Sequence, residues 1–136
     1  MGNITALLAE DVDIMRRLLK NALSTYNCNV IAEVENGNDV VTQVETAAPD
    51  IVFLDINLPG KNGLDVLQDL RKINKDIFIA MVSGFSSFEN VKAALEYGAN
   101  GFIVKPFTTV KVKEMIDKYH AMKQGGQIDG SLISKS

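Results

Sequence analysis

Short apolar runs alternate with longer amphipathic stretches along most of the chain. The short runs are typical of buried strands, and the longer stretches repeat apolar residues every three or four positions, as amphipathic helices do. The strands are predicted at residues 4–9, 29–34, 51–54, 77–82 and 101–104. The helices are predicted at residues 12–26, 40–48, 64–73, 88–95 and 110–119. Strict alternation of the two predicts an α/β fold, a parallel sheet with helices on both faces and right-handed crossovers.

The apolar content of these segments indicates how each is buried. Residues 51–54 are almost wholly apolar, which suits a parallel strand buried on both faces. Residues 29–34 are less apolar and are expected nearer an edge of the sheet. In the helix at 12–26, the pattern places three basic residues on the polar, exposed face, namely Arg16, Arg17 and Lys20.

Composition narrows the class of protein. The 136 residues fit one domain, and 46% hydrophobic with 23% charged residues excludes a wholly disordered chain. The formal net charge of -3 argues against a nucleic-acid binder that works through its overall field. The sequence has one cysteine, Cys28, and one histidine, His120. It therefore forms no internal disulfide and offers no Cys/His zinc cluster, and a Ser-His triad that needs its base anywhere other than at His120 is excluded.

The sequence shows no targeting signal, and its carboxyl-terminal segment differs in composition from the rest. No apolar run approaches the ~20 residues that a membrane-spanning helix needs, and the amino terminus lacks the pattern of a secretory signal. We therefore expect a cytoplasmic protein without membrane contact, in which Cys28 is a reduced, structural thiol. Residues 1–123 are expected to form the domain. The Gly/Ser-rich segment 124–136 favours a disordered tail or the beginning of a linker.

Polar residues directly follow four of the predicted strands. The carboxyl ends of parallel strands meet at one edge of the sheet, where doubly wound folds bind their ligands. The residues brought together in this way are Glu10 and Asp11 after the first strand, Asp55 and Asn57 after the third, Ser83 after the fourth and Lys105 after the fifth. Three carboxylates, a hydroxyl and an ammonium are therefore predicted at one small site.

Such a group of side chains suits phosphoryl chemistry. Neighbouring carboxylates repel one another, so a cation stabilises their ionised forms, and oxygen ligands of this kind suit Mg²⁺. With the ammonium of Lys105 and the hydroxyl of Ser83, the cation would offset the charge on a phosphoryl group. Asp55 ends the most buried predicted strand and is the best placed nucleophile for an aspartyl phosphate.

Each of these residues also has a simpler interpretation. Capping the following helix could be the sole role of Asp11, and capping is the better interpretation of Asp13. Asp55 could be a turn residue, Ser83 could bind its own backbone, and Lys105 could be an exposed lysine. The shared site is favoured because four strand ends each deliver a residue that the same chemistry requires.

Four segments together resemble the receiver domain of two-component response regulators, and single-domain chemotaxis regulators are the most similar in length. The segments are Leu7-Leu8-Ala9-Glu10-Asp11, Phe53-Leu54-Asp55-Ile56-Asn57-Leu58-Pro59-Gly60, Val82-Ser83-Gly84 and Val104-Lys105-Pro106-Phe107. The resemblance covers about residues 4–123. It implies a flavodoxin-like, doubly wound sheet of five parallel strands in the order 2-1-3-4-5, with five helices.

The resemblance also implies the phosphoacceptor and the metal ligands. Asp55 matches the phosphoacceptor. Glu10 and Asp11 match the acidic pair that organises Mg²⁺, for which Mn²⁺ or Ca²⁺ can substitute in a crystal. Asp55 and the backbone carbonyl of Asn57 match the further metal ligands. Glu10 stands where many members have Asp, and its extra methylene allows it to bind the metal through water.

A second set of residues matches the family's switch. Ser83 matches the hydroxyl that follows the phosphoryl group, and Lys105 matches the lysine that pairs with it. Phe102 matches an aromatic residue whose burial changes on activation; the chemotaxis protein has Tyr there, so switching at Phe102 would act by packing alone. The Lys105-Pro106 bond resembles one that is cis in the family. Asn57 and Phe85 resemble variable positions that tune dephosphorylation.

The function implied is a phosphorylation switch in bacterial two-component signalling. A histidine kinase, a histidine phosphotransfer protein or a small donor such as acetyl phosphate would form a 4-aspartylphosphate at Asp55. This would shift the packing of a face made by residues 88–95, 101–104 and 110–119, which an unidentified downstream protein binds. Such a domain turns over no external substrate, binds no nucleic acid directly, and is a monomer or a phosphorylation-dependent dimer.

Alternative functions remain open. The chain could be a phosphorelay intermediate, or the receiver fragment of a larger regulator with an output domain. Asn57 disfavours a metal-dependent hydrolase that works through an aspartyl phosphate, because such enzymes carry a second Asp at that position. Glu10 and Asp11 disfavour a flavin-binding electron carrier, because they would repel the flavin phosphate.

Overall fold

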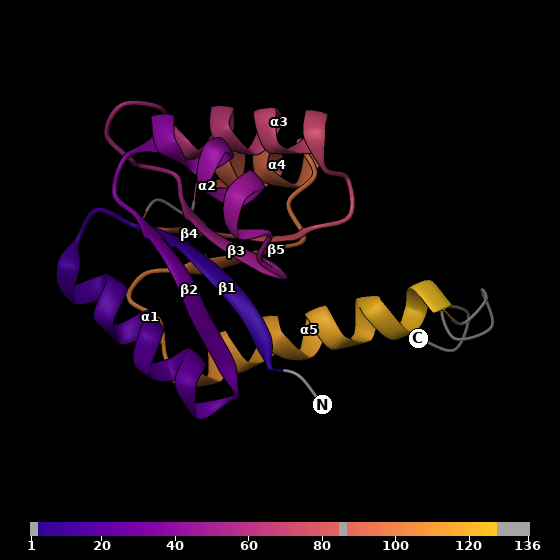
Figure 1. Ribbon diagram of the computed structural model, residues 1–136. Coiled ribbons are helices and arrows are strands. Elements are labelled where there is room, and N and C mark those ends of the chain that lie inside the picture. Colours follow the sequence, from indigo (N-terminus) through magenta and orange to yellow (C-terminus); the bar gives the residue numbers. More distant parts are fainter. Residues whose placement is uncertain (1–2, 85–86, 128–136) are drawn as a thin grey trace.

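A computed structural model describes residues 3–84 and 87–127. Five parallel strands form one sheet in the order β2-β1-β3-β4-β5, as predicted (Figure 1). The strands are β1 (Ile4–Ala9), β2 (Cys28–Val34), β3 (Ile51–Asp55), β4 (Phe78–Ser83) and β5 (Gly101–Val104). The helices are α1 (Asp13–Thr25), α2 (Val40–Ala47), α3 (Gly63–Ile73), α4 (Phe88–Glu96) and α5 (Thr109–Gln127). Their alternation confirms the flavodoxin-like α/β architecture.

The helices form two layers. Figure 1 shows α1 and α5 against one face of the sheet, and α2, α3 and α4 against the other. In β3, Ile51 and Phe53 belong to the core shared with α1 and α5, while Val52 and Leu54 belong to the core shared with α2 and α3. All four are at most 1% exposed, so β3 is buried on both faces, as its apolar sequence predicts. The less apolar β2 lies at an edge.

Three strands differ by one residue from the prediction, and one helix differs more. β2 begins one residue earlier, at Cys28, β3 ends one residue later, at Asp55, and β4 is shifted by one residue to Phe78–Ser83. α5 continues to Gln127, past Gln124, where the segment predicted as a tail begins. A helix tolerates a glycine at a cost of about 1 kcal/mol relative to alanine, and the two glycines there do not end α5. Residues 128–136, the rest of the predicted tail, lie outside the described residues.

Arg71 joins three segments at the amino-terminal edge of the sheet. From the last turn of α3, its guanidinium donates to the carbonyl oxygens of Asn74, Ile77 and Gly98 at 3.1, 2.7 and 2.9 Å. It also donates to Asn100 Oδ1 at 2.8 Å. Gly98 follows α4, so Arg71 fixes the carboxyl end of α4 to the end of α3 and the beginning of β4.

Cys28 is buried at the beginning of β2, as a structural thiol should be. It is 3% exposed and packs in the core beneath α1 and α5. Burial, together with the charge of Asp50, raises the pKa of the thiol to about 11. Among the described residues, no helix is long and apolar enough to cross a membrane.

We expect Cys28 to resist thiol reagents in the folded protein. A pKa two units above its usual value leaves about a hundredfold less thiolate at pH 8, and thiolate is the reactive form. Labelling with a chromogenic disulfide reagent should therefore be at least that much slower in buffer than in denaturant. Equal rates in the two conditions would contradict the buried position.

Candidate functional site

Asp55 is the last residue of β3 and is 4% exposed. Its strand lies between β1 and β4, so its carboxylate lies beside the ends of both neighbours. The apolar residues that precede it bury the strand and hold the carboxylate at the carboxyl-terminal edge of the sheet. The N–H of Asn57 donates to Asp55 Oδ1 at 3.1 Å, which restricts the rotation of the side chain.

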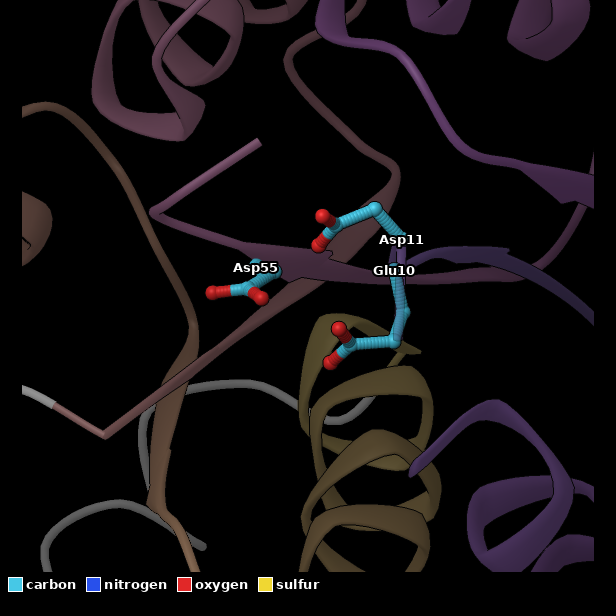
Figure 2. A group of neighbouring side chains, drawn as sticks. All are labelled: Glu10, Asp11 and Asp55. Carbon is cyan, nitrogen blue, oxygen red and sulfur yellow. The ribbon is translucent and has the colours of Figure 1, made fainter. Parts of the chain in front are cut away.

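Glu10 and Asp11, directly after β1, bring two further carboxylates to Asp55 (Figure 2). One oxygen from each of the three lies within 4.8 Å of the others. Glu10 is 1% exposed, whereas Asp11 is exposed, so the group is open to solvent on one side. This spacing allows one divalent cation to contact oxygens of all three residues, directly or through water.

Lys105, directly after β5, pairs with two of these carboxylates. Its Nζ lies 2.6 Å from Glu10 Oε1 and 2.9 Å from Asp55 Oδ2. Burial alone would lower the pKa of Lys105, but its hydrogen bonds with the two carboxylates and their charges raise it above the ordinary value. Lys105 is therefore charged at neutral pH and offsets part of the acidic group. The Lys105-Pro106 bond is cis, as the resemblance implies.

Glu10 is the most constrained of the carboxylates. Burial raises its pKa, and the charge of Asp55 acts in the same direction, against the opposing effect of hydrogen bonds from Lys105 and Val12. The N–H of Val12 donates to Glu10 Oε2 at 3.1 Å. The buried Oε1 is ion-paired with Lys105 Nζ at 2.6 Å and has no other partner among the described residues. A buried carboxylate oxygen with spare acceptor capacity fits a cation site.

A glycine holds the loop after Asp55 against the end of β3. The N–H of Gly63 donates to the carbonyl oxygen of Ile56 at 2.7 Å, and a Cβ on Gly63 would overlap the carbonyl oxygen of Asp55. Asn62 caps α3 by accepting from the N–H of Leu64 at 2.8 Å. The first residue of α3 therefore lies directly against the backbone of Asp55, where no side chain fits.

The remaining predicted site residues lie on neighbouring segments. Ser83 ends β4 and is fully buried, and its carbonyl oxygen accepts from the N–H of Lys105 at 2.9 Å. Phe102, in β5, is half-buried against the core beneath α2, α3 and α4. Asn57 is exposed. Phe85 lies outside the described residues.

Residues 6–117 match the response regulator receiver domain, a range that includes every site residue described above. The chain belongs to the response regulator receiver family. As a receiver with the acidic pocket of Glu10, Asp11 and Asp55, it is a signalling switch rather than a classical enzyme. Its acidic cluster is typical of the Mg²⁺ site of receivers.

The similar proteins include chemotaxis receivers. The chain is 35% identical to the chemotaxis protein CheY of Bacillus subtilis over 112 residues, which cover 82% of this chain and 93% of CheY. It is 33% identical to CheY-3 of Vibrio cholerae over 118 residues, or 85% of this chain and 91% of that protein. A chain in the crystal structure of the CheX-CheY-BeF3-Mg²⁺ complex from Borrelia burgdorferi matches with 27% identity and a TM-score of 0.80, over 83% of this receiver and 86% of that chain.

The sequence patterns misplaced two side chains of this receiver. The helical period assigns Arg16 to an exposed face, but its side chain is 12% exposed and its Nη1 donates to the carbonyl oxygen of Glu10 at 2.8 Å. Asp13 does not cap α1: the helix begins at Asp13 itself, and the side chain pairs with Arg16 at 2.9 Å and Arg17 at 3.2 Å. A carboxylate in the first turn faces residues three and four positions later, which explains both contacts.

Proposed function

We propose that Asp55 accepts a phosphoryl group in a Mg²⁺-dependent reaction, with a histidine kinase or a histidine phosphotransfer protein as the donor. The observation that carries this proposal is the pairing of Lys105 Nζ with both Glu10 and Asp55, at 2.6 and 2.9 Å, beside the exposed Asp11. An ammonium placed between buried carboxylates is ready to pair with phosphate oxygens once they are attached to Asp55.

In the transfer, an oxygen of the Asp55 carboxylate forms a bond to phosphorus while the bond from phosphorus to the donor breaks. The donor leaves with that electron pair, as an imidazole that takes up a proton or as acetate when acetyl phosphate is used. Mg²⁺, when bound, supplies charge that offsets the transferring oxygens. The residues proposed to hold it are Glu10, Asp11, Asp55 and the carbonyl of Asn57.

Ser83 and Lys105 are proposed to bind the phosphate oxygens after the transfer. Their backbones are joined by the 2.9 Å hydrogen bond between β4 and the segment after β5, so movement of one affects the other. Phe102 lies in β5, just before Lys105 in the chain, and can change its packing with them. These three residues link the phosphorylation site to the face formed by α4, β5 and α5.

The surface of that face supports a protein-binding role. Large apolar side chains are exposed on all three of its elements, namely Phe88, Leu95, Val104 and Val110. The related complex from Borrelia burgdorferi contains CheX, BeF3 and Mg²⁺, which supports a protein partner and a divalent cation for this receiver as well. We propose that a downstream protein binds here when Asp55 is phosphorylated.

Incubation with acetyl phosphate and Mg²⁺ tests the phosphoacceptor. Intact-mass spectrometry should show one added phosphoryl group, lost when Mg²⁺ is chelated and absent from Asp55→Asn, whose amide is not a nucleophile. As a matched control, Asp39→Asn changes an exposed carboxylate outside the acidic group and should be labelled like the unsubstituted chain. An adduct that persists in Asp55→Asn would place the acceptor elsewhere.

A further inference from the structure

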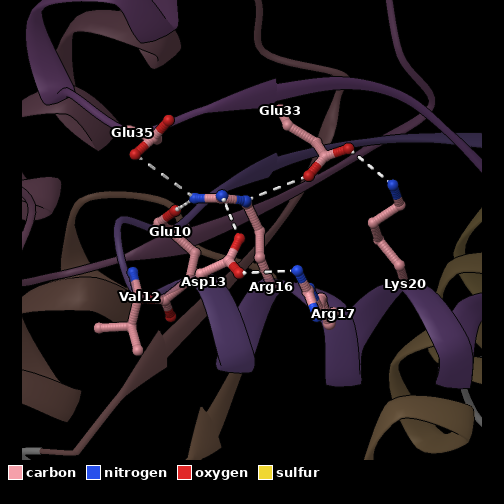
Figure 3. A network of polar contacts seen from close by, with 8 residues as sticks. All are labelled: Glu10, Val12, Asp13, Arg16, Arg17, Lys20, Glu33 and Glu35. Atoms are coloured by element: carbon pink, nitrogen blue, oxygen red, sulfur yellow. Dashed lines mark hydrogen bonds and ion pairs between the residues drawn. The ribbon is translucent and has the colours of Figure 1, made fainter.

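Arg16 belongs to α1 but contacts the loop that carries the acidic pair. Its side chain is 12% exposed, and its Nη1 donates to the carbonyl oxygen of Glu10 at 2.8 Å (Figure 3). A partly buried guanidinium that donates to a backbone carbonyl restricts the position of that peptide. The peptide in question joins Glu10 to Asp11.

The guanidinium is itself held by carboxylates on two elements. Its Nε lies 3.1 Å from Glu33 Oε1 on β2, and its Nη2 lies 2.9 Å from Asp13 Oδ1 on α1 (Figure 3). Glu35 Oε1 lies farther away, 3.8 Å from Nη1. Glu33 is anchored in turn by Lys20, at 2.8 Å. The charge of Arg16 is thus offset locally, so it adds little repulsion toward a cation at the acidic group.

Glu10 is fixed on every side by this arrangement. Its N–H donates to the carbonyl oxygen of Val34 at 3.0 Å, and its own carbonyl oxygen accepts from Arg16. Its Oε2 accepts from the N–H of Val12 at 3.1 Å. The directions of the Glu10 and Asp11 side chains follow from their backbone, and Arg16 is the side chain that joins this backbone to α1 and β2.

We infer that Arg16 is a positioning residue for Glu10 and Asp11, setting the directions in which their carboxylates meet a divalent cation. This inference rests on the Mg²⁺ site of the proposed function. Groups that hydrogen-bond to metal ligands and orient them typically lower the metal affinity ten- to a hundredfold when they are removed. Arg16→Ala should therefore weaken Mg²⁺ binding by about tenfold, the lower end of that range, because Arg16 acts through the backbone.

Lysine should not replace Arg16. The contacts to Glu10 and Glu33 use different nitrogens of one planar group, and an ammonium cannot reproduce that fork. Arg16→Lys should consequently bind Mg²⁺ nearly as weakly as Arg16→Ala. Arg17→Ala is the matched control, since Arg17 is the next residue of α1, has a side chain 75% exposed and forms an ion pair only with the shared Asp13 among the described residues.

The test is calorimetric titration of the metal-free full chain with MgCl2, combined with NMR of the same samples before Mg²⁺ is added. Arg16→Ala should raise the dissociation constant about tenfold, whereas Arg17→Ala should leave it unchanged. In the metal-free spectrum of Arg16→Ala, the amide of Val12 should shift and exchange faster, because its hydrogen bond to Glu10 is loosened, while amides inside α1 stay protected. If Arg16→Ala does not fold, Glu33→Gln removes one anchor of the guanidinium and should give an intermediate dissociation constant.

A folded Arg16→Ala, or Glu33→Gln in its place, with the dissociation constant of the unsubstituted chain would overturn this inference and leave the proposed function intact. The same holds if stability falls but Mg²⁺ binding does not change, since that is the result of a purely structural role. An unsubstituted chain that binds no Mg²⁺ would instead contradict the proposed function, and this inference with it.

Discussion

Replacing Lys105 by alanine is expected to lower the free energy of unfolding of the metal-free protein by about 3 kcal/mol at pH 7, the lower end of the loss seen when one partner of a buried ion pair is removed. Lys105 is 16% exposed, while the side chains of its partners Glu10 and Asp55 are 2% and 5% exposed. Without the ammonium, two buried carboxylates would face each other with no cation between them. Urea denaturation with and without Mg²⁺ measures the loss, and Mg²⁺ should restore much of it.

The loss should also depend on pH. Burial already raises the pKa of Glu10, so its proton is held more tightly in the folded than in the unfolded state. Stability from this group is full below the ordinary pKa and declines as pH rises through the raised one. Removing Lys105 raises that pKa further, so the loss at pH 7 should exceed the loss at pH 5.

Lys113→Ala, which breaks an exposed pair with Asp117, should leave the denaturation midpoint unchanged. A pH-independent loss in Lys105→Ala would contradict the assigned cause.

Gly63→Ala is expected to disrupt both the fold and the site. The new Cβ would overlap the carbonyl oxygen of Asp55 and lie 2.7 Å from Ile56 Cα, and both are backbone atoms that cannot rotate away. The loop must move, which breaks the hydrogen bond from Gly63 to Ile56. We expect a loss of about 3 kcal/mol or more, at the upper end for overpacking. Labelling by acetyl phosphate should fall at temperatures where the variant is still folded, because the Asp55 carboxylate is displaced.

Gly84→Ala provides a matched control for this substitution. Gly84 follows Ser83 at the same edge of the sheet, but a Cβ there would meet no atom of the described residues within 4 Å. Its thermal midpoint and its labelling should therefore match those of the unsubstituted chain. If both glycine variants behaved alike, the close approach of α3 to Asp55 would not be the cause.

The fold was largely predictable because burial on a sheet follows a local period. β3 shows this directly, since its four apolar residues alternate between two cores. A strand with helices on both sides of the sheet is buried on both faces, so apolar residues are favoured at successive positions in it. The site followed from the same pattern, because Asp55 ends a strand and Glu10, Asp11 and Lys105 come directly after strands that end at the same edge. α5 was predicted too short, because its apolar period stops before the helix does.

The long-range partner of Arg16 could not be predicted in this way. Glu33 is 17 positions away in sequence and reaches Arg16 only because of how β1 pairs with β2. That pairing shifts between Ala6 and Leu7, so that Leu8 lies opposite Glu33. A shift of one residue moves every later side chain to the other face. The apolar pattern of a half-buried edge strand does not encode such a shift, which depends on contacts across the whole sheet.

The hydrogen bonds of Arg71 limit how α4 can move. Through Gly98, Arg71 holds the carboxyl end of α4 at the edge of the sheet opposite Asp55. The amino end of α4 is capped by Ser87, which follows the site residue Ser83 by four positions in the chain. A tilt of α4 would therefore leave its carboxyl end in place and move its amino end. With 9 residues and a rise of 1.5 Å per residue, a tilt of about 10° would displace the free end by roughly 2 Å. A small change at the strand ends would thus appear mainly at the amino end of α4, beside Phe88, while the packing around Arg71 stays as it is.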